Sequence, residues 1–294
     1  MRLFRTLLLG GTATALGATM ALSATTAAPT AASREHAVAA HYTAAFLAEA
    51  QAAFIKDLRK PDVAMFPHGR PGVHAGSNAS SLSSFNWAGY GDSSATHGEF
   101  TKVSGAWKVP AVTCTSEDRI TAEWVGLDGL TSSTVEQDGT SSQCFQGKAI
   151  YYSWYEMYPA GSIAVGTTVA AGDNISASVS RSGASYTLKL TDSTHTANSF
   201  SKAGSCATST CVDTSAEWIV ERPAYSIGIV PEAQFSTVKF TSGSAVAAGK
   251  TVTIGSGPSP DVLTCIDATR TYDIVSTGGL SGGNSFTSTW KDSY

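Results

Sequence analysis

Two glutamates on one expected β-strand are the strongest candidates for chemistry in this chain. Glu217 and Glu221 lie in Ser215-Ala-Glu-Trp-Ile-Val-Glu-Arg-Pro223, where Trp, Ile and Val favour a strand and the proline ends it. Side chains alternate between the faces of a strand, so both glutamates point the same way as Ile219. A carboxylate among such residues must be paired, hydrogen-bonded or neutral, and such groups cluster at functional sites. The alternative is that both glutamates face solvent on a half-exposed strand, because Glu is rarely fully buried.

Two other segments place polar groups among aromatic residues. The run Tyr151-Tyr-Ser-Trp-Tyr-Glu-Met-Tyr-Pro159 alternates along an expected strand. The residues that share one of its faces are Tyr152, Trp154, Glu156 and Tyr158. Such a face is typical of a binding cleft on a concave sheet, and equally of a packed core with one hydrogen-bonded glutamate. The stretch 122–139 contains further candidates, among them Trp124, Asp128 and Gln137.

From Phe85 onward the chain consists of short β-patterned runs separated by Gly, Asn, Asp and Ser. Many short strands without alternating helices predict an antiparallel sandwich or barrel, here as one domain. The expected strands cover residues 86–90, 100–109, 120–127, 150–158, 167–171, 175–179, 185–190, 216–221, 236–240, 251–254 and 285–290.

The N-terminal part of the chain predicts export and a latent form. A basic start followed by a short apolar run is typical of a secretory signal peptide, here residues 1–28. Residues 34–60 are Ala-rich, free of Gly and Pro and apolar at helical spacing, so we expect a helix. Residues 29–82 are either a helical propeptide with a cleavable linker, which we favour, or a cap that stays attached to the domain of residues 83–294. No later segment approaches the roughly 20 apolar residues that span a bilayer, so we expect a secreted protein without a membrane anchor.

Composition excludes several classes of function. A formal net charge of -4 with 14% charged residues excludes an electrostatic nucleic-acid binder. With few carboxylates to neutralise, the chain is expected to tolerate acid. The six histidines are scattered without zinc-ligand spacing, and we expect neither a metal nor another cofactor. Disulfides persist after export; the most plausible pairs are Cys114 with Cys144 and Cys206 with Cys211, which leaves Cys265 unpaired, although spacing does not fix the connectivity.

Taken in order, these segments resemble the glutamic peptidases, or eqolisins. The resemblance rests on Ser84-Phe-Asn-Trp-Ala-Gly-Tyr90, Val103-Ser-Gly-Ala-Trp-Lys-Val-Pro110, Trp124-Val-Gly-Leu-Asp-Gly129, Glu136-Gln-Asp-Gly139, Trp154-Tyr-Glu-Met-Tyr-Pro159 and Ala216-Glu-Trp-Ile-Val-Glu221. It implies a β-sandwich of two antiparallel sheets, concanavalin A-like or jelly-roll, made behind a helical propeptide. It also implies a secreted, pepstatin-insensitive acid endopeptidase that acts on polypeptides, and we expect a monomer.

The resemblance also implies an active site. Its catalytic pair falls on Glu221 and on Gln137, in a Glu-Gln-Asp-Gly stretch that we expect to be a turn. The substrate-binding residues around it are Trp87, Trp124, Asp128, Glu156 and Tyr158. The chain departs from the family with Tyr152 where Asp is common and with Met157 where Trp is common. These departures bear on subsite preference and leave the catalytic pair intact.

The chemistry of the pair is coherent by itself. Glu221 can take a proton from water and return it to the departing amine, and it serves both roles best near its own pKa, about 4 to 5 if little perturbed. The Gln137 amide offers an N–H donor to the developing oxyanion and a carbonyl that orients the water, and it is neutral at every pH. An acid optimum is therefore expected.

Other functions fit parts of the sequence. Glu156 and Glu221 on an aromatic face would suit a retaining glycosidase, which needs carboxyls roughly 5 Å apart but has no role for Gln137. A non-catalytic carbohydrate-binding sandwich module is the third candidate, and the long helical segment ahead of the domain disfavours it. Gly279-Leu-Ser-Gly-Gly283 fits G-x-S-x-G but lacks the strand-to-helix context, so a serine hydrolase is not expected.

Overall fold

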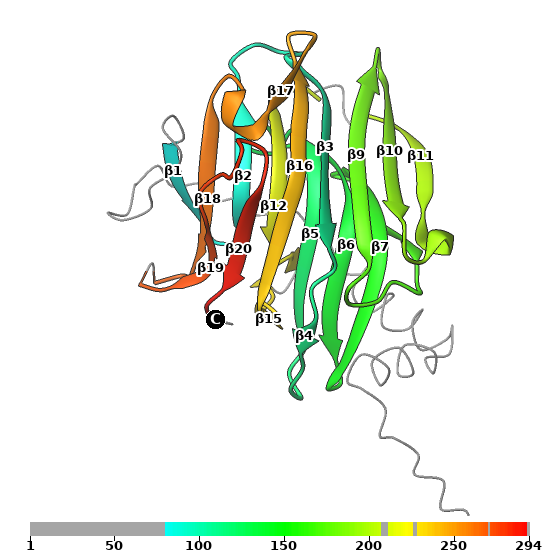
Figure 1. The fold of residues 1–294 in the computed structure, drawn as a ribbon, viewed down its shortest axis with the longest axis vertical. Coiled ribbons are helices and arrows are strands. Elements are labelled where there is room, and N and C mark those ends of the chain that lie inside the picture. Colours follow the sequence, from blue (N-terminus) through cyan, green and yellow to red (C-terminus); the bar gives the residue numbers. More distant parts are fainter. Residues whose placement is uncertain (1–79, 207–210, 226–227, 270, 293–294) are drawn as a thin grey trace, which may run out of the picture.

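The computed structural model describes residues 80–206, 211–225, 228–269 and 271–292 (Figure 1). The expected signal peptide and the expected helix of the propeptide lie outside these residues. Most of the described chain forms β-strands, and its helical segments are the short 3-10 turns η1 (Thr196–Asn198) and η2 (Ile254–Ser256). Within the described ranges, no helix has the length and apolar character that a membrane span requires.

The strands form two layers that share one long strand, β16 (Thr237–Ala247) (Figure 1). The hydrogen-bonded order of the first layer is β11 (Phe200–Ser205), β10 (Ser185–Asp192), β9 (Asn174–Ser182), β3 (Phe100–Lys108) and β16. The second layer continues from β16 through β20 (Phe286–Trp290), β19 (Asp273–Thr277), β18 (Pro260–Ile266), β2 (Trp87–Ser93), β12 (Ser215–Glu221), β5 (Arg119–Leu127), β6 (Val135–Phe145), β7 (Lys148–Tyr158) and β8 (Ile163–Gly166). One half of β16 pairs with β20 and the other with β3, so the layers are continuous.

Short strands complete the fold. They are β1 (Ser80–Ser84) beside β18, β17 (Lys250–Thr253) beside β16, β13 (Ala224–Tyr225) with β14 (Gly228–Ile229), and β15 (Gln234–Phe235) with β4 (Val112–Thr113). The β1–β18 pair is parallel, and the other pairs of named strands in the described chain are antiparallel. The prediction of a nearly all-β, antiparallel fold is confirmed.

The sequence located most apolar strands but missed several others. The strand expected at 167–171 is wrong, since β8 ends at Gly166. The strands that were not expected are β1, β4, β6, β8, β11, β13, β14, β15, β18 and β19. The predicted turn around Gln137 is also wrong, because this residue lies within β6, between β5 and β7. The β6 sequence is mostly polar yet almost entirely buried, so it shows no alternation of polar and apolar residues to mark it as a strand.

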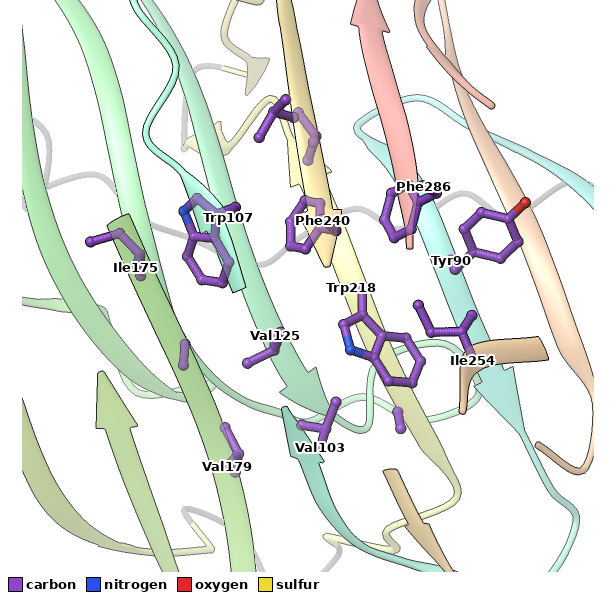
Figure 2. Packing of buried hydrophobic residues seen from close by; sticks show 14 of the residues in the cluster. Tyr90, Val103, Trp107, Val125, Ile175, Val179, Trp218, Phe240, Ile254 and Phe286 are labelled. Carbon is purple, nitrogen blue, oxygen red and sulfur yellow. The ribbon is translucent and has the colours of Figure 1, made fainter. Parts of the chain in front are cut away.

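A hydrophobic core fills the space between the layers (Figure 2). The ring of Phe240 on the shared strand stacks on Phe286 with centroids 5.0 Å apart and lies 5.3 Å from Trp107. Trp218 of β12 enters the same core, and its indole N–H donates to the carbonyl oxygen of Ser104 on the facing layer at 2.8 Å. Because Trp218 points inward, its neighbours on β12 must point to the opposite face.

Both predicted disulfides are present. Cys114 is bonded to Cys144 of β6, and Cys206 is bonded to Cys211. Cys265 of β18 carries no disulfide and is buried, as expected.

Carboxyl groups are buried inside this fold. Glu123 points into the interlayer core, where its oxygens accept hydrogen bonds from Thr140 at 3.0 Å and Thr121 at 3.4 Å. Burial still raises the pKa of Glu123 from 4.5 to about 8. Burial likewise raises the pKa of Glu232 to about 8 and that of Asp138 well above its usual range. The folded protein therefore holds protons that the unfolded chain would release above about pH 4.5.

The fold is expected to lose stability as pH rises between about 4.5 and 8. In this window the folded state binds more protons than the unfolded state, so the free energy of unfolding falls by about 1.4 kcal/mol per pH unit for each such proton. The midpoint of urea unfolding should therefore be higher at pH 4 than at pH 7. The Glu123→Gln variant, which has one titrating group fewer, should show a shallower pH dependence. A midpoint that rises with pH would contradict this prediction.

Candidate active site

Both faces of β12 are buried. Ala216, Trp218 and Val220 belong to the interlayer core, whereas Ile219 packs on the opposite face. There it joins the aromatic cluster, which comprises Trp87, Ala122, Trp124, Val135, Trp154, Tyr158, Ile219 and Leu263. Glu217 is 0% exposed and Glu221 is 7% exposed. The interpretation that these glutamates face solvent is therefore wrong, because the strand is central and the aromatic cluster covers its outer face.

The strand register brings the predicted site residues onto this face. Glu217, Gly126, Gln137 and Glu156 form one cross-strand row through β12, β5, β6 and β7. The adjacent row consists of Ile219, Trp124, Gly139 and Trp154. Glu221 lies beyond these rows at the end of β12, opposite Trp87 of β2. Residues far apart in the sequence thus meet because five neighbouring strands hold them in register.

Trp124 connects Glu221 with Gln137. Its indole N–H donates to Oε2 of Glu221 at 2.8 Å. The far edge of its ring lies over Gly126, where an added Cβ would be 2.9 Å from the ring and 3.2 Å from Cβ of Gln137. Gly139 is equally constrained, since a Cβ there would lie 2.7 Å from Cβ of Trp124 and 2.1 Å from a backbone oxygen. The two glycines provide the space that the indole occupies.

Glu221 is hydrogen-bonded through both oxygens. Besides the Trp124 bond to Oε2, Oε1 accepts a hydrogen bond from Nδ2 of Asn86 at 3.3 Å. Burial raises the pKa of Glu221 to about 7, while Trp124, Trp87 and Asn86 partly oppose the shift. The sequence-based value of 4 to 5 assumed little perturbation, and this condition is not met. Glu221 is therefore a proton donor in acid.

Gln137 and Glu156 form the second half of the site. Nε2 of Gln137 donates to Oε2 of Glu156 at 2.5 Å, and Oε1 of Gln137 accepts no hydrogen bond from any described residue. Burial, together with the negative charge of Glu221, raises the pKa of Glu156 to about 8. This charge effect shows that the two glutamates are electrostatically close. The Gln137 carbonyl oxygen is thus a buried acceptor without a hydrogen-bond donor among the described residues.

The other predicted substrate-binding residues have distinct surroundings. Trp87 packs edge-on against Trp124, with ring centroids 5.0 Å apart and planes at 78°. Tyr158 lies in the aromatic cluster at the end of β7. Asp128 is completely buried, and its oxygens accept hydrogen bonds from the backbone N–H groups of residues 212, 213 and 214. Asp128 thus anchors the segment that leads into β12.

A hollow of about 810 Å³ lies next to this anchored segment and contains neither Glu221 nor Gln137. Its lining is rich in hydroxyl groups and consists of Ser93, Ser94, Ala95, His97, Thr131, Ser132, Ser133, Val212, Thr214, Pro258 and Ser259. It lies at the opposite end of β12 from Glu221, because Ser93 pairs with Ser215. The hollow is therefore separate from the candidate catalytic pair.

The two departures from the family pattern point to opposite faces. Tyr152 packs against the aromatic cluster and shares a cross-strand row with Glu221, through Ser141 and Ala122. Met157 packs on the interlayer core, where its sulfur would lie 2.6 Å from a Cβ added to Gly204. Only the change at Tyr152 therefore lies on the face of the candidate site.

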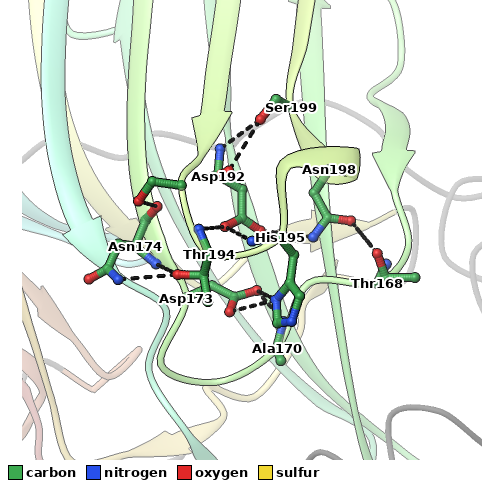
Figure 3. Close-up of polar contacts among 10 residues, drawn as sticks. Thr168, Ala170, Asp173, Asn174, Asp192, Thr194, His195, Asn198 and Ser199 are labelled. Atoms are coloured by element: carbon green, nitrogen blue, oxygen red, sulfur yellow. Dashed lines mark hydrogen bonds and ion pairs between the residues drawn. The ribbon is translucent and has the colours of Figure 1, made fainter.

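Asp173, Asp192 and His195 bring potential metal ligands together away from this site (Figure 3). Hydrogen bonds within the protein already engage their carboxylates. Oδ1 of Asp192 accepts from the backbone N–H groups of Thr194 and His195, and its Oδ2 accepts from Asn198. Nδ1 of His195 lies 2.9 Å from both oxygens of Asp173, and this contact raises the pKa of His195. The group anchors the turn between β10 and β11. A second group of potential ligands comprises Asp128, Glu136 and Asp213, where Arg181 pairs with Asp213 at 3.1 Å.

Sequence reasoning did not identify Ser84 and Asn86 as site residues. Both are completely buried, and Asn86 contacts Glu221 directly. Their position immediately before Trp87 in Ser84-Phe-Asn-Trp was the available signal. A buried Asn beside a predicted site aromatic needs a partner for its amide, and a nearby carboxylate provides one.

Comparisons with known proteins identify relatives of this chain. Residues 85–290 match the sequence pattern of the Peptidase A4 family. Aspergillopepsin-2 from Aspergillus niger is 31% identical over 227 residues, which cover 68% of this chain and 75% of that protein. A crystal structure of scytalido-glutamic peptidase with a transition state analog inhibitor is similar with a TM-score of 0.59 and 29% identity, over 70% of this chain and 98% of that chain. Aspergilloglutamic peptidase from Aspergillus niger has a TM-score of 0.51 and 27% identity, over 59% of this chain and 99% of that chain.

Replacing Glu221 by Gln should lower the pKa of Glu156, because the substitution removes the negative charge that raises it. The measurement is a titration of the Glu156 side-chain carboxyl carbon by NMR, with an expected decrease of up to about one unit. Glu217→Gln is the matched control, since Glu217 lies on the same strand and face but does not contribute to the Glu156 shift. An unchanged pKa of Glu156 in Glu221→Gln would show that the two carboxyls are not close.

Proposed function

The chain belongs to the Peptidase A4 family of glutamic endopeptidases, and we propose that it is secreted and hydrolyses polypeptides in acid with Glu221 and Gln137 as its catalytic pair. The observation that supports this pair most strongly is the Trp124 indole, which bonds to Glu221 and lies beside Gln137. The family assignment disfavours the glycosidase and carbohydrate-binding alternatives, and Gln137 would have no required role in a glycosidase.

Glu221 exchanges protons in both directions. With a pKa of about 7 it begins the cycle in acid as the carboxylic acid. One oxygen donates its proton to the scissile carbonyl oxygen while the other accepts a proton from the attacking water, and the carbon–oxygen bond forms. Glu221 then protonates the amide nitrogen, the carbon–nitrogen bond breaks, and a hydroxyl of the tetrahedral intermediate returns a proton to Glu221. The products are a carboxylic acid and an amine, and Glu221 is regenerated.

Gln137 binds the reacting groups without titrating. Its Nε2 carries two hydrogens, of which one is donated to Glu156. The second hydrogen can stabilise the developing oxygen of the tetrahedral intermediate, and Oε1 can orient the attacking water. Glu156, with a pKa of about 8, remains neutral in acid and fixes the Gln137 amide.

The substrate contacts proposed around this pair come from the aromatic cluster and its neighbours. Trp87, Trp124 and Tyr158 offer apolar and aromatic surface for substrate side chains. Glu156 acts through Gln137, and Asp128 acts through residues 212–214, whose backbone it holds. Tyr152, on the same face, is the departure expected to alter subsite preference.

Two physical effects favour activity at acid pH. Glu221 must hold a proton to begin the cycle, so activity falls as pH rises through about 7. The buried carboxyls stabilise the folded state when they hold protons, so the fold is also favoured in acid. Pepstatin insensitivity follows because the pair is one Glu and one Gln and no paired aspartates are involved.

The prepro organisation remains part of the proposal. We assign residues 1–28 to a signal peptide, residues 29–82 to a helical propeptide and linker, and the remaining residues to a monomeric peptidase domain with concanavalin A-like or jelly-roll layers. β1 begins at Ser80 and pairs with β18, and Leu82 packs against the aromatic cluster. The expected boundary after residue 82 would divide β1 and remove Leu82 from the cluster, whereas cleavage just before Ser80 would preserve these contacts.

The proposal is tested by cleavage of an acid-denatured protein between about pH 2 and 8, with pepstatin present. Gln137→Ala should lower kcat/KM by about 10²- to 10³-fold, because one donor to the developing oxygen is lost. Glu221→Gln should lower it further, because both proton-transfer roles are lost. Glu217→Gln, a change of equal chemistry on the same strand, should retain most activity. Full activity of Glu221→Gln would exclude Glu221 as the catalytic residue, and sensitivity to pepstatin would contradict the Glu/Gln mechanism.

A further inference from the structure

We propose that Asn86 is a positioning residue for Glu221 and that Ser84 fixes the orientation of the Asn86 amide. This inference rests on the proposed catalytic role of Glu221. It assigns a function to the short connection between β1 and β2, which contributes no other polar side chain to the site among the described residues.

The contact between Asn86 and Glu221 determines how the carboxyl group is held. Nδ2 of Asn86 donates to Oε1, and Nε1 of Trp124 donates to Oε2, so each oxygen has a donor of its own. Two donors on different oxygens fix the rotation of the carboxyl plane. The Asn86 amide also opposes the effect of burial on the pKa of Glu221. Asn86 therefore acts on the geometry and on the proton affinity of the same group.

Ser84 determines which end of the Asn86 amide faces Glu221. Its hydroxyl donates to Oδ1 of Asn86 at 3.1 Å and accepts from the backbone N–H groups of Asn86 at 3.2 Å and Trp87 at 3.0 Å. With these three bonds the hydroxyl has no capacity left to accept from a side-chain amide. A flipped Asn86 would bring its NH₂ to this saturated hydroxyl and its carbonyl to the Glu221 carboxyl. The observed orientation is the one that satisfies every group.

The backbone of Asn86 is fixed as firmly as its side chain. Its carbonyl accepts a hydrogen bond from the backbone N–H of Arg222 at 2.9 Å, and Arg222 directly follows Glu221. Asn86 is therefore bound to β12 through both its backbone and its side chain. Because both Ser84 and Asn86 are 0% exposed, water does not compete for these bonds.

Other titratable groups also act near Glu221. Glu156 of β7, Glu232 in the loop before β15 and Cys265 of β18 respond to it, because the charge of Glu221 raises the pKa of each. Arg222 directly follows Glu221 in the chain, after the end of β12. These groups are unchanged in the variants below, so a shift of the Glu221 pKa would report the loss of the Asn86 donor.

The test measures the pH dependence of kcat/KM and the NMR titration of the Glu221 carboxyl carbon in Asn86→Leu, Ser84→Ala and Ser84→Thr. Asn86→Leu keeps the branched shape of the side chain but removes the donor, so the pKa of Glu221 and the loss of activity near pH 7 should move up by about one pH unit. The kcat should fall about tenfold with little change in KM. Ser84→Ala should also raise the pKa of Glu221 and the pH at which activity is lost, but by less than Asn86→Leu. Ser84→Thr, which keeps the hydroxyl, should remain close to wild type.

Asn198→Leu is the matched control, because Asn198 is also a buried, hydrogen-bonded Asn but lies in the turn between β10 and β11. A purely structural defect lowers stability, so such a variant loses activity at lower pH, opposite to the shift expected for Asn86→Leu. The inference would be overturned if the pKa of Glu221 were unchanged in Asn86→Leu, or if this variant lost activity at a lower pH than wild type, as expected for Asn198→Leu. If Asn86→Leu does not fold, equal titrations of Ser84→Ala and Ser84→Thr would overturn it. Full activity of Glu221→Gln would instead overturn the proposed catalytic role, while the NMR titration still tests the Asn86 contact.

Discussion

The hydrogen bond from the Trp124 indole to Glu221 joins the two halves of the site, and several features of the sequence make it geometrically feasible. The indole lies across a sheet surface from which side chains are absent at Gly126 and Gly139. A methyl group at either position would displace the ring, so the spacing of these glycines is a packing requirement. Tryptophan suits this position because its large, rigid ring packs beside Gln137 while its indole N–H donates a hydrogen bond to Glu221.

Burial of carboxyl groups is the second constraint, and it connects stability to function. Glu221 and Glu156 hold protons in acid for the same reason that Glu123 and Glu232 do, namely desolvation by the surrounding fold. As the pH rises through about 7 to 8, these groups ionise in a poorly solvating environment, and the fold loses stability. A protein with such buried carboxyl groups is more stable in acid, where these groups are protonated. The acidic residues of the site thus share a property of the whole domain.

The sequence predicted the all-β class, both disulfides and the face of β12 because each depends on local pattern or ordered motifs. It did not predict β6, where burial on both faces removes the alternation that marks a strand. Nor did it predict the pKa of Glu221, which depends on neighbours from other strands. Asn86 was visible as a residue but not as a contact, since its partner lies on a strand far along the chain. Local chemistry could be predicted from the sequence, whereas burial and contacts between distant strands could not.

The central claim is that Glu221 and Gln137 act on the same reacting atoms. A double-mutant cycle tests it most directly, by comparing kcat/KM of Glu221→Gln and Gln137→Ala with that of the double variant. Residues that work as one unit are strongly non-additive, so the double variant should be about as slow as Glu221→Gln alone. Independent effects that multiply in the double variant would contradict the claim and separate the two residues into different roles.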